Sequence, residues 1–456
     1  TQTCSPQLPL KSCTVTQKVV ISGPKYCNAR SLDMQSNYEV KVGDCLTSPS
    51  SSYRVKKIIG SGAYGKVTLC QKASNNQMVA LKVLTNPHDD YAGQKEARIL
   101  QMLQEGDSGH DNIVRYMGSF QYEGHHCHEF EKLDIDMNDF LKSRPHMTLQ
   151  LTEIRPIIAQ MARALQYLKT KGIVHCDLKP VNIMMTDHIQ QPLHVKLIDF
   201  GIACPVGEAE HGTLVQTLNY RAPEVQVGGA ITEAIDIWSV GCIAAQMFLG
   251  THLFATTNQY DLMRHVVRIV GQPPKHVLDS GKHTRNFFRR PKGTSQWIYR
   301  SRLIQRPFPL TIASLDDIYE NDPFNGKKMT SPAENQDRRL FVDLLKHMLD
   351  LDPVSRYTPE DILNHPFITM SHLQHCFPLY YSKCQKIMDQ VLNSSNEDEQ
   401  TGAGSDLPGN REQVMVVKST IHLYLPYADQ RGFRRDSHNL HGKEAERRKK
   451  KCRKKG

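Results

Sequence analysis

The residue types with the clearest chemistry lie in one short stretch, HCDLKPVN, at residues 175–182. Asp177 and Asn182 stand five positions apart, which is the spacing of base and metal ligand in phosphoryl-transfer loops of the form H-R-D-x-x-x-x-N. In such a loop Asp177 would accept or orient the proton of a substrate hydroxyl, Lys179 would steady the transferred phosphate, and Asn182 would hold a magnesium ion. Cys176 replaces the arginine of this pattern, so either activity or its control could differ.

Other motifs supply the remaining groups that such a reaction needs. The strand-like stretch VALKV carries Lys82, which could contact the α- and β-phosphates of ATP, and Glu96 on the next predicted helix could pair with it. The motif DFG begins with Asp199, a ligand for the other metal site, and RAPE at residues 221–224 follows a segment long enough for an activation loop. A solvated lysine or glutamate is the alternative for each residue alone, but chance does not explain the order and spacing of the whole set.

A glycine-rich segment, GSGAYGKV at residues 60–67, precedes Lys82. It matches G-x-G-x-x-G-x-V, in which glycines let backbone amides approach phosphates and Val67 caps an adenine. A plain hairpin turn is the alternative, whereas a dinucleotide-binding fold would need a helix next, and a strand-like segment follows instead. The residues predicted to contact ATP are Gly60, Ser61, Gly62, Ala63, Tyr64, Gly65, Lys66, Val67, Ala80, Lys82, Glu131 and Leu133.

Three further residues are predicted to support the site without touching substrate. Asp236, at the start of DIWSVG, should bind the backbone of the loop that carries Asp177. Arg356, in DPVSRYT, should pair with Glu224, and His365, in HPF, should be packed and hydrogen-bonded rather than bound to metal.

The hydrophobic periodicity changes along the chain and predicts the elements that position these residues. The fold class expected is α+β, with a small β-rich lobe followed by a larger helical lobe. The predicted divisions are a flexible segment over 1–47 with a short strand at 38–42, a catalytic domain over 48–372 with lobes of about 48–134 and 135–372, and a largely disordered tail over 373–456. Strands are predicted over 53–60, 66–73 and 78–84, and helices over 94–104, after Thr152, and over 235–250, 259–270, 338–349 and 359–364.

Charge is uneven along the 456 residues. The formal net charge is +10, and residues 443–456 hold nine Lys or Arg against two Glu, so this end carries +7 of it. The basic end could be a nuclear-import signal, a contact for nucleic acid or acidic lipid, or a solvated end. The remainder is near balance, so we do not expect a nucleic-acid-binding protein apart from this tail.

The cysteines and apolar runs indicate a chain folded in a reducing compartment. None of the twelve cysteines forms a C-x-x-C pair or a zinc-like spacing, which favours reduced thiols. The longest apolar run, near residues 240–249, is too short to cross a bilayer. No signal-peptide pattern follows Thr1, so neither secretion nor a membrane partner is expected.

Together these motifs resemble those of the eukaryotic protein kinases over residues 53–367. The closer resemblance is to the homeodomain-interacting protein kinases, which are related to the dual-specificity tyrosine-regulated kinases. It is carried by HCDLKPVNIMM, KLIDFGIA, EAIDIWSVGCIAAQMFLG, NQYDLMRHVVRIVGQPP and FVDLLKHMLDLDPVSRYTPEDILNHPFITMSHL. The resemblance implies a two-lobed kinase domain over 48–372 and an extra C-lobe segment at about 273–329.

The same resemblance implies what the protein does and where. The activity would be transfer of the γ-phosphate of ATP, with Mg²⁺, to serine or threonine of protein substrates. The location would be the nucleus and also the cytoplasm, the substrates and partners would include transcription factors or co-regulators, and the chain would be monomeric.

The sequence departs from the family pattern in the activation segment. Leu214 replaces the tyrosine that relatives autophosphorylate, and Leu218 replaces an arginine linked to a preference for proline after the phosphorylated residue. Thr217 keeps the hydroxyl expected beside Asp177. In kinases switched by a loop phosphate, the arginine before the catalytic Asp binds that phosphate, so Cys176 and Leu214 together argue against this control and not against catalysis.

Two other functions stay open at this stage. A pseudokinase scaffold is favoured by Leu214, Leu218, the irregular hinge EFEKL and His128 in a strand expected to be apolar. A small-molecule kinase is disfavoured by RAPE and by the long helical lobe. A reactive thiol at Cys176, activated by the neighbouring histidine, is a further alternative.

Overall fold

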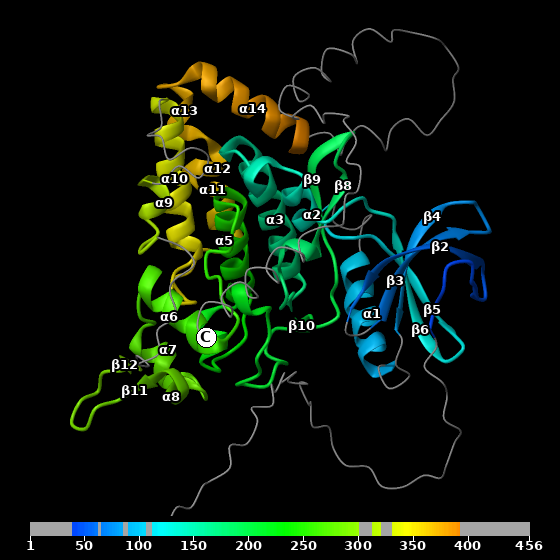
Figure 1. Ribbon diagram of the computed structural model, residues 1–456, viewed down its shortest axis with the longest axis horizontal. Helices are drawn as coiled ribbons and strands as arrows, with labels where there is room; N and C mark the ends of the chain where they lie inside the picture. The colour runs from blue at the N-terminus through cyan, green and yellow to red at the C-terminus, as the bar shows by residue number, and fades with distance from the viewer. Residues whose placement is uncertain are drawn as a thin grey trace, which may run out of the picture. The chain divides into compact units, whose positions relative to one another are not determined.

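The computed structural model describes residues 39–62, 65–84, 90–105, 112–300, 312–320 and 331–392. Within these ranges there is no helix of the length and apolarity that crossing a membrane requires. Figure 1 shows one group of strands with a single helix and a second, mainly helical group, as the sequence predicts. The basic end at 443–456 lies outside the described residues.

The β-rich lobe is built on one antiparallel sheet of six strands in the order β1-β2-β3-β4-β6-β5. Buried and less buried side chains alternate along the first half of β2 and along β4, as expected for strands with one face on a core. Helix α1 packs against β5 and β6. The elements are β1 (Cys45–Thr47), β2 (Ser52–Ser61), β3 (Gly65–Lys72), β4 (Met78–Leu84), α1 (Asp90–Gln104), β5 (Tyr116–Tyr122) and β6 (His125–Glu131).

The first strand does not lie where the sequence predicted it. Residues 39–42 are not a strand, and β1 instead pairs with β2 through Cys45–Thr47. Gly43 turns the chain at φ +97° and its N–H donates to the Val55 carbonyl at 2.9 Å, so pairing starts only after this turn. The flexible segment predicted over 1–47 therefore ends too late, because its last residues belong to the sheet.

The helical lobe carries most of the core. Its first part comprises α2 (Met137–Lys142), η2 (Pro145–Met147), α3 (Leu151–Thr170), β7 (Ile173–Val174), η3 (Pro180–Asn182), β8 (Ile183–Asp187), β9 (Gln191–Leu197), β10 (Cys204–Pro205), η4 (Leu218–Tyr220), α4 (Pro223–Gln226) and α5 (Ala234–Leu249). The rest comprises α6 (Gln259–Ile269), α7 (Lys275–Ser280), α8 (Thr284–Phe287), β11 (Phe288–Arg289), β12 (Ile298–Tyr299), α9 (Asp317–Glu320), α10 (Pro332–Met348), α11 (Pro359–Asn364), α12 (Pro366–Thr369), α13 (Ser371–Gln374) and α14 (Pro378–Leu392).

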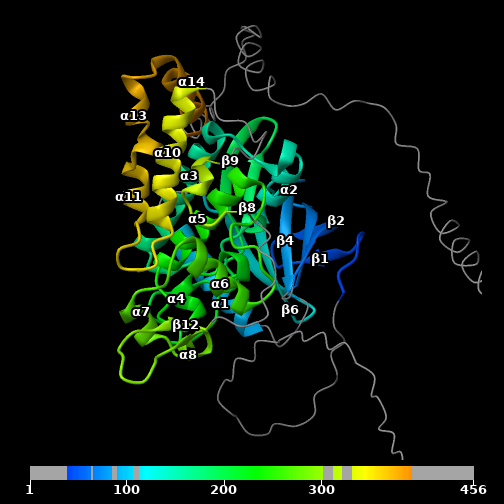
Figure 2. The ribbon, with the colours of Figure 1, turned by 60° about the vertical axis from the view of Figure 1, so that its left-hand side comes forward.

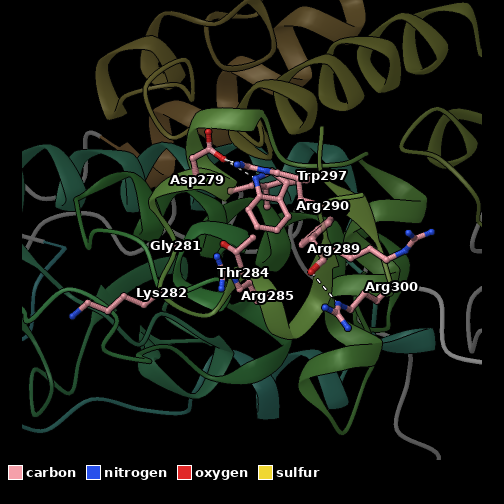
Figure 3. Close-up of a pocket in the computed structure, with 11 residues that line it drawn as sticks. Asp279, Gly281, Lys282, Thr284, Arg285, Arg289, Arg290, Trp297 and Arg300 are labelled. Carbon is pink, nitrogen blue, oxygen red and sulfur yellow. Dashed lines mark hydrogen bonds and ion pairs between the residues drawn. The ribbon is translucent and has the colours of Figure 1, made fainter. Parts of the chain in front are cut away.

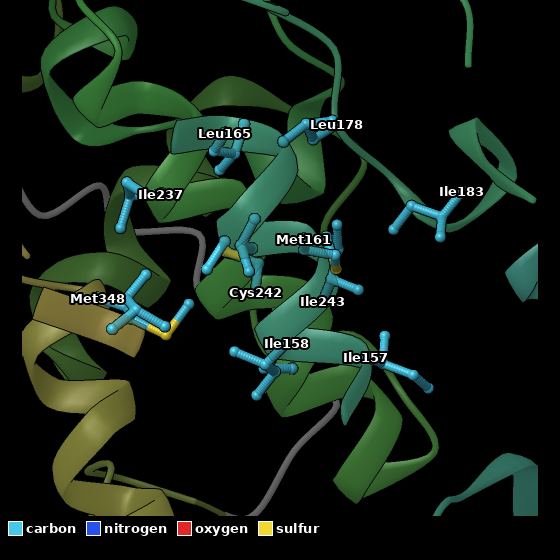
Figure 4. Packing of buried hydrophobic residues seen from close by; sticks show 14 of the residues in the cluster. Ile157, Ile158, Met161, Leu165, Leu178, Ile183, Ile237, Cys242, Ile243 and Met348 are labelled. Carbon is cyan, nitrogen blue, oxygen red and sulfur yellow. The ribbon is translucent and has the colours of Figure 1, made fainter. Parts of the chain in front are cut away.

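Helices α3 and α5 pack side by side at the centre of this lobe (Figure 2). In Figure 4, Met161 of α3 lies beside Ile243 of α5, and Met348 of α10 lies at the far side of the same core. Helix α5 is apolar on almost all sides, which is typical of a helix enclosed by others. Both ends of the catalytic stretch at 175–182 lie in this core. The core therefore gives the site a rigid base.

Three predicted helix starts are wrong. Helix α1 begins at Asp90, four residues before the predicted start at 94. Helix α3 begins at Leu151 rather than after Thr152, because Gln150 and Glu153 form a reciprocal capping box around its first turn. Helix α10 begins at Pro332, six residues before the predicted Arg338, with the Ser331 side chain as its N-cap. Side-chain caps set the boundaries of α3 and α10, and hydrophobic periodicity does not reveal such caps.

The tail predicted over 373–456 is not disordered at its start. Helix α14 buries Cys384, Met388 and Val391 and packs against α3. These three positions share one helix face, and Tyr380, Tyr381, Ile387 and Leu392 of the same helix also pack against the core, so the prediction of disorder from residue 373 overlooked an apolar face. The Tyr380 hydroxyl also donates to Asp337 at 3.2 Å, so the folded unit extends to Leu392.

His128 is a fully buried imidazole in β6, opposite Lys82 of β4. Neither ring nitrogen has a hydrogen-bond partner among the described residues, and the nearest carboxylate oxygen, on Glu96, is 3.9 Å from Nε2. Burial, together with the smaller effect of the positive charges of His126 and Lys82, lowers the His128 pKa to about 3. Between about pH 3 and pH 6.5, the His128 imidazole is therefore neutral in the folded chain and protonated in the unfolded chain.

This makes an acid sensitivity that can be measured. Because the folded pKa lies below the unfolded value of about 6.5, stability from this group is complete above pH 6.5 and is lost as pH falls toward 3. When pH falls from 6.5 to 4.5, the His128→Phe variant should lose roughly 2–3 kcal/mol less free energy of unfolding than the unmodified chain does. Urea unfolding at the two pH values measures this difference. The matched control is His276→Phe at an exposed site, and equal acid slopes for both variants would assign the sensitivity to other groups.

Candidate active site

The loop that carries Asp177 is fixed through its backbone. The Asp236 carboxylate, at the start of α5, accepts from the N–H groups of His175 and Cys176 at 2.7 and 3.1 Å, as the sequence predicted. Burial raises the Asp236 pKa to about 6, although these two N–H groups and the charge of His175 lower it. The Asn182 side-chain amide donates to the Asp177 carbonyl at 2.9 Å, so the loop is also closed on itself.

Two residues, Thr217 and Lys179, meet at the Asp177 carboxylate. Oδ1 accepts from the N–H and the hydroxyl of Thr217 at 3.0 and 2.7 Å, and Oδ2 binds the Lys179 ammonium at 2.6 Å. Lys179 also donates to the Thr217 hydroxyl at 3.2 Å. The hydroxyl retained at Thr217 therefore lies beside Asp177 as predicted, and the carboxylate is oriented from both sides.

Lys82 joins the β-rich lobe to the DFG segment. Its ammonium contacts both oxygens of Glu96 at 2.7 and 2.9 Å and Asp199 Oδ1 at 2.8 Å. Burial alone would lower the Lys82 pKa, but attraction to the two carboxylates outweighs this and raises it. Burial likewise would raise the Asp199 pKa, and Lys82 instead lowers it. Both groups are therefore charged at neutral pH, and the ion pair expected between Lys82 and Glu96 is present.

Two of these segments hold a strained backbone. Cys176 has φ +68° and Asp199 has φ +63°, both in the left-handed region that residues with a side chain rarely occupy. Such residues cost about 1–3 kcal/mol each and persist where the surroundings fix them, commonly at functional sites. Here the hydrogen bonds of Asp236 and Lys82 fix these two residues.

The glycine-rich segment forms a hairpin between β2 and β3. The Gly62 N–H donates to the Gly65 carbonyl at 2.9 Å, while Ala63 and Tyr64 lie outside the described residues. A Cβ at position 65 would stand 2.2 Å from the Val83 carbonyl oxygen, so only glycine fits against β4. The Lys66 ammonium pairs with the exposed Glu39 at 2.9 Å, and its contact with a phosphate stays a prediction.

The other residues predicted to contact ATP lie on β2 to β4 and at the end of β6. Gly60 and Val67 are opposite each other in the sheet, and Val67 is also opposite Lys82. The Glu131 side chain already binds the Arg115 N–H and the Lys196 ammonium, both at 2.7 Å. A role for Glu131 in binding adenine would therefore use its backbone.

The activation segment is tied down by a residue that the sequence did not reveal. Gln216 donates its N–H to the Cys176 carbonyl at 3.0 Å, and its side-chain amide donates to the Ile235 carbonyl and the Ser239 hydroxyl. Arg221 adds contacts to the carbonyls of Val215 and Gln216, each at 2.9 Å. No sequence motif marks Gln216, because its role depends on chain segments that come together only when the protein folds.

The predicted support residues are also in contact. Arg356 binds Glu224 through two parallel hydrogen bonds of 2.6 and 3.0 Å, with both side chains buried. His365 is buried, accepts from the Phe367 N–H at 3.1 Å and contacts Asp343 at 3.1 Å. His365 is thus packed and hydrogen-bonded, as the sequence predicted.

Oxygen atoms suited to magnesium are present on Asn182 and Asp199. The amide nitrogen of Asn182 is used by the Asp177 carbonyl, which leaves its oxygen for another contact, and Asp199 keeps Oδ2 when Oδ1 binds Lys82. No cluster of three or more His, Cys, Asp or Glu suited to a metal occurs within the described ranges. The pair of oxygens on Asn182 and Asp199 fits Mg²⁺, which takes one or two protein oxygens together with phosphates and water.

Cys176 is not an activated thiol. Its side chain is fully buried, and Sγ lies 3.6 Å from Sγ of Cys204 on β10. The contact with Cys204 and burial both raise the Cys176 pKa, so almost no thiolate forms at neutral pH. This removes the basis for the reactive-thiol alternative.

Alkylation should therefore separate buried from exposed thiols. In native protein at pH 8, we expect iodoacetamide to modify Cys176 at least about 100-fold more slowly than the exposed Cys376. Peptide mass mapping after timed quenching measures both rates in one sample, and denatured protein gives the reference. Comparable rates in native protein would contradict the buried, neutral thiol.

A two-lobed fold with this loop, this lysine and this DFG segment has the architecture of the protein kinase class. A model of the protein kinase domain matches residues 53–368, and the chain belongs to this family. It is similar to homeodomain-interacting protein kinase 1 of Mus musculus, with 39% identity over 355 residues that cover 74% of this chain and 29% of the relative. It is also similar to serine/threonine-protein kinase ppk15 of Schizosaccharomyces pombe, with 32% identity and 75% and 67% coverage. The chain spans less than a third of the mouse relative.

Proposed function

We propose that this chain transfers the γ-phosphate of ATP to serine and threonine hydroxyls of protein substrates. The observation that carries the proposal is the position of Lys82, which binds Glu96 and Asp199 at once. Asp199 in turn lies within the electrostatic influence of Lys179, beside Asp177. The groups for phosphate binding, metal binding and proton transfer therefore form one connected set.

Each residue has a role that follows from its contacts. Lys82 would move from Asp199 to the α- and β-phosphates while Glu96 keeps it in place. Asp177, held by Thr217 and Lys179, would orient the attacking hydroxyl and receive its proton. Asn182 and Asp199 would hold Mg²⁺, which supplies charge neutralisation for the phosphates when bound.

Transfer of radiolabelled phosphate to a generic basic protein, with Mg²⁺ and ATP, tests this function. We expect incorporation at least about 100-fold above an Asp199→Ala control. Phosphoamino-acid analysis should find phosphoserine and phosphothreonine. Folded protein whose melting temperature rises with Mg-ATP, but which transfers nothing above the control, would instead identify a pseudokinase scaffold.

The names of the relatives suggest where the activity is used. Because several relatives are named as homeodomain-interacting kinases, the proposed substrates and partners are transcription factors or co-regulators, and the proposed location is the nucleus. The basic tail at 443–456 would serve nuclear import. Since Leu218 replaces the arginine linked to proline preference, no proline-directed preference is included in the proposal.

A further inference from the structure

A second site lies in the C-lobe insert that follows α6. A pocket of about 640 Å³ is bounded by α7, α8 and the β11–β12 hairpin, and none of its lining residues belongs to the candidate active site. Figure 3 shows long cationic side chains around its rim. Five cations line it, namely Lys282, Arg285, Arg289, Arg290 and Arg300.

The positive charge of this pocket is largely uncompensated. Asp279 is the one acidic lining residue, and it already binds Lys275, Arg290 and the Trp297 indole N–H. These contacts hold the Asp279 pKa near 2, so the carboxylate stays ionised and occupied. In the part of the chain that the structure describes, no carboxylate pairs with three of the other cations, Lys282, Arg285 and Arg289.

The pocket is attached to the segment that would meet a protein substrate. The N–H groups of Lys282 and His283 donate to the carbonyls of Gly228 and Val227, just after RAPE, at 3.1 and 2.7 Å. The His283 ring nitrogen Nε2 contacts the Gly212 carbonyl of the activation segment at 2.9 Å. The Lys282 side chain also covers Gly212, where an added Cβ would stand 2.7 Å from Lys282 Cδ. The rim of the pocket is therefore continuous with the activation segment.

The chemistry of the lining favours a compact, highly charged anion. Guanidinium groups match the oxygens of phosphate and carboxylate and bind them through paired hydrogen bonds. Stacking with a nucleobase is disfavoured, because the Arg290 guanidinium lies 4.5 Å from the Trp297 ring centroid and Asp279 takes the indole N–H. A concave site for one anion also differs from the extended basic surface that nucleic acid or a membrane requires.

We propose that this pocket binds a phosphoserine or phosphothreonine within an acidic segment of a protein substrate. The proposal rests on the proposed function, since the group recognised is the product of serine or threonine phosphorylation. A substrate phosphorylated once would be retained beside the activation segment, which raises its local concentration for a second transfer. The pocket would thereby select substrates that already carry a phosphate.

Binding is tested on the full chain without ATP, so that the result does not depend on transfer. The probe is a fluorescein-labelled acidic peptide with one phosphoserine, and fluorescence anisotropy gives its Kd. Arg285→Ala/Arg289→Ala should weaken binding at least about tenfold, whereas Lys292→Ala/Lys386→Ala, which removes the same charge at exposed sites outside the pocket, should change it less than about twofold. Melting temperatures check that both variants are folded.

The other arms separate the possible ligands. The peptide with serine in place of phosphoserine should bind at least about tenfold more weakly, and inorganic phosphate should compete with the phosphopeptide. Equal loss in the pocket and control variants, or equal affinity for both peptides, would overturn the proposal. Pocket-dependent binding to vesicles of phosphatidylcholine and phosphatidylserine, or to a single-stranded RNA, without phosphopeptide binding would overturn it in favour of those ligands. Phosphopeptide binding by a chain with no transfer activity would refute the proposed function alone.

Discussion

Replacing Asp177 with asparagine should lower the rate of phosphate transfer by roughly 100- to 10,000-fold, the range of contribution of a general base. Asparagine can still accept from the N–H and hydroxyl of Thr217, so the loop should keep its shape. It cannot receive the substrate proton, and it loses the charged contact with Lys179. The effect should fall on kcat, because no contact of Asp177 supports nucleotide binding directly.

The measurement is the steady-state rate of phosphate transfer at saturating ATP, with Asp389→Asn on the exposed face of α14 as the matched control. Thermal shift with Mg-ATP should give the same increase for Asp177→Asn and the unmodified chain, because Lys82, Glu96 and Asp199 are unchanged. A variant that keeps more than about a tenth of the activity would mean that another group takes the proton.

The parts of the site that the sequence predicted are those with a fixed spacing or a fixed partner. The two motifs imply that the Asp236 carboxylate accepts hydrogen bonds from backbone N–H groups of the loop at 175–182. The structure contains these bonds. The strand that carries Lys82 and the helix that carries Glu96 were predicted for the same reason. Local periodicity and motif spacing encode such pairs directly.

The parts that were missed depend on side chains that act between distant segments. Gln216 joins the catalytic loop to α5 through hydrogen bonds that no spacing rule describes. Helix α14 packs an apolar face against α3, and this tertiary packing, which the prediction of disorder from residue 373 overlooked, stabilises the helix. The basic pocket likewise arises only when the β11–β12 hairpin folds back on α7 and α8.

These missed contacts answer the question raised by the cysteine of HCDLKPVN. Cys176 points to Cys204, and its carbonyl accepts from Gln216, so backbone hydrogen bonds connect the loop to the activation segment. Arg221 binds two carbonyls of the same segment. Hydrogen bonds to uncharged backbone carbonyls thus take the place of a phosphate–arginine pair. Leu214 has no hydroxyl that could carry the phosphate. The arrangement is consistent with a segment that is ordered without modification.

Arg356→Ala should lower the free energy of unfolding by about 3–5 kcal/mol, the usual cost of removing one partner from a buried ion pair. The Arg356 side chain is 0% exposed, forks onto Glu224, and donates to the carbonyls of Ala234 and Asp350 at 2.8 and 2.9 Å. Its guanidinium also lies 5.2 Å from the Trp238 ring centroid. Alanine would therefore leave the buried Glu224 carboxylate without the Arg356 donors and would remove one donor from each of the two carbonyls.

Urea unfolding measures this loss, and Lys346→Ala is the matched control. Lys346 pairs with Asp316 at 2.6 Å, but both side chains are exposed, so its removal should cost less than about 1 kcal/mol. Arg356→Met/Glu224→Gln should regain part of the stability, because it removes both charges and keeps most of the volume. The stability loss of Arg356→Lys should lie between those of Arg356→Ala and Lys346→Ala. Lysine keeps the positive charge but cannot make the two parallel hydrogen bonds of the guanidinium. A loss for Arg356→Ala as small as that of Lys346→Ala would show that the Glu224 pair is replaced by solvent contacts and does not hold RAPE against α5.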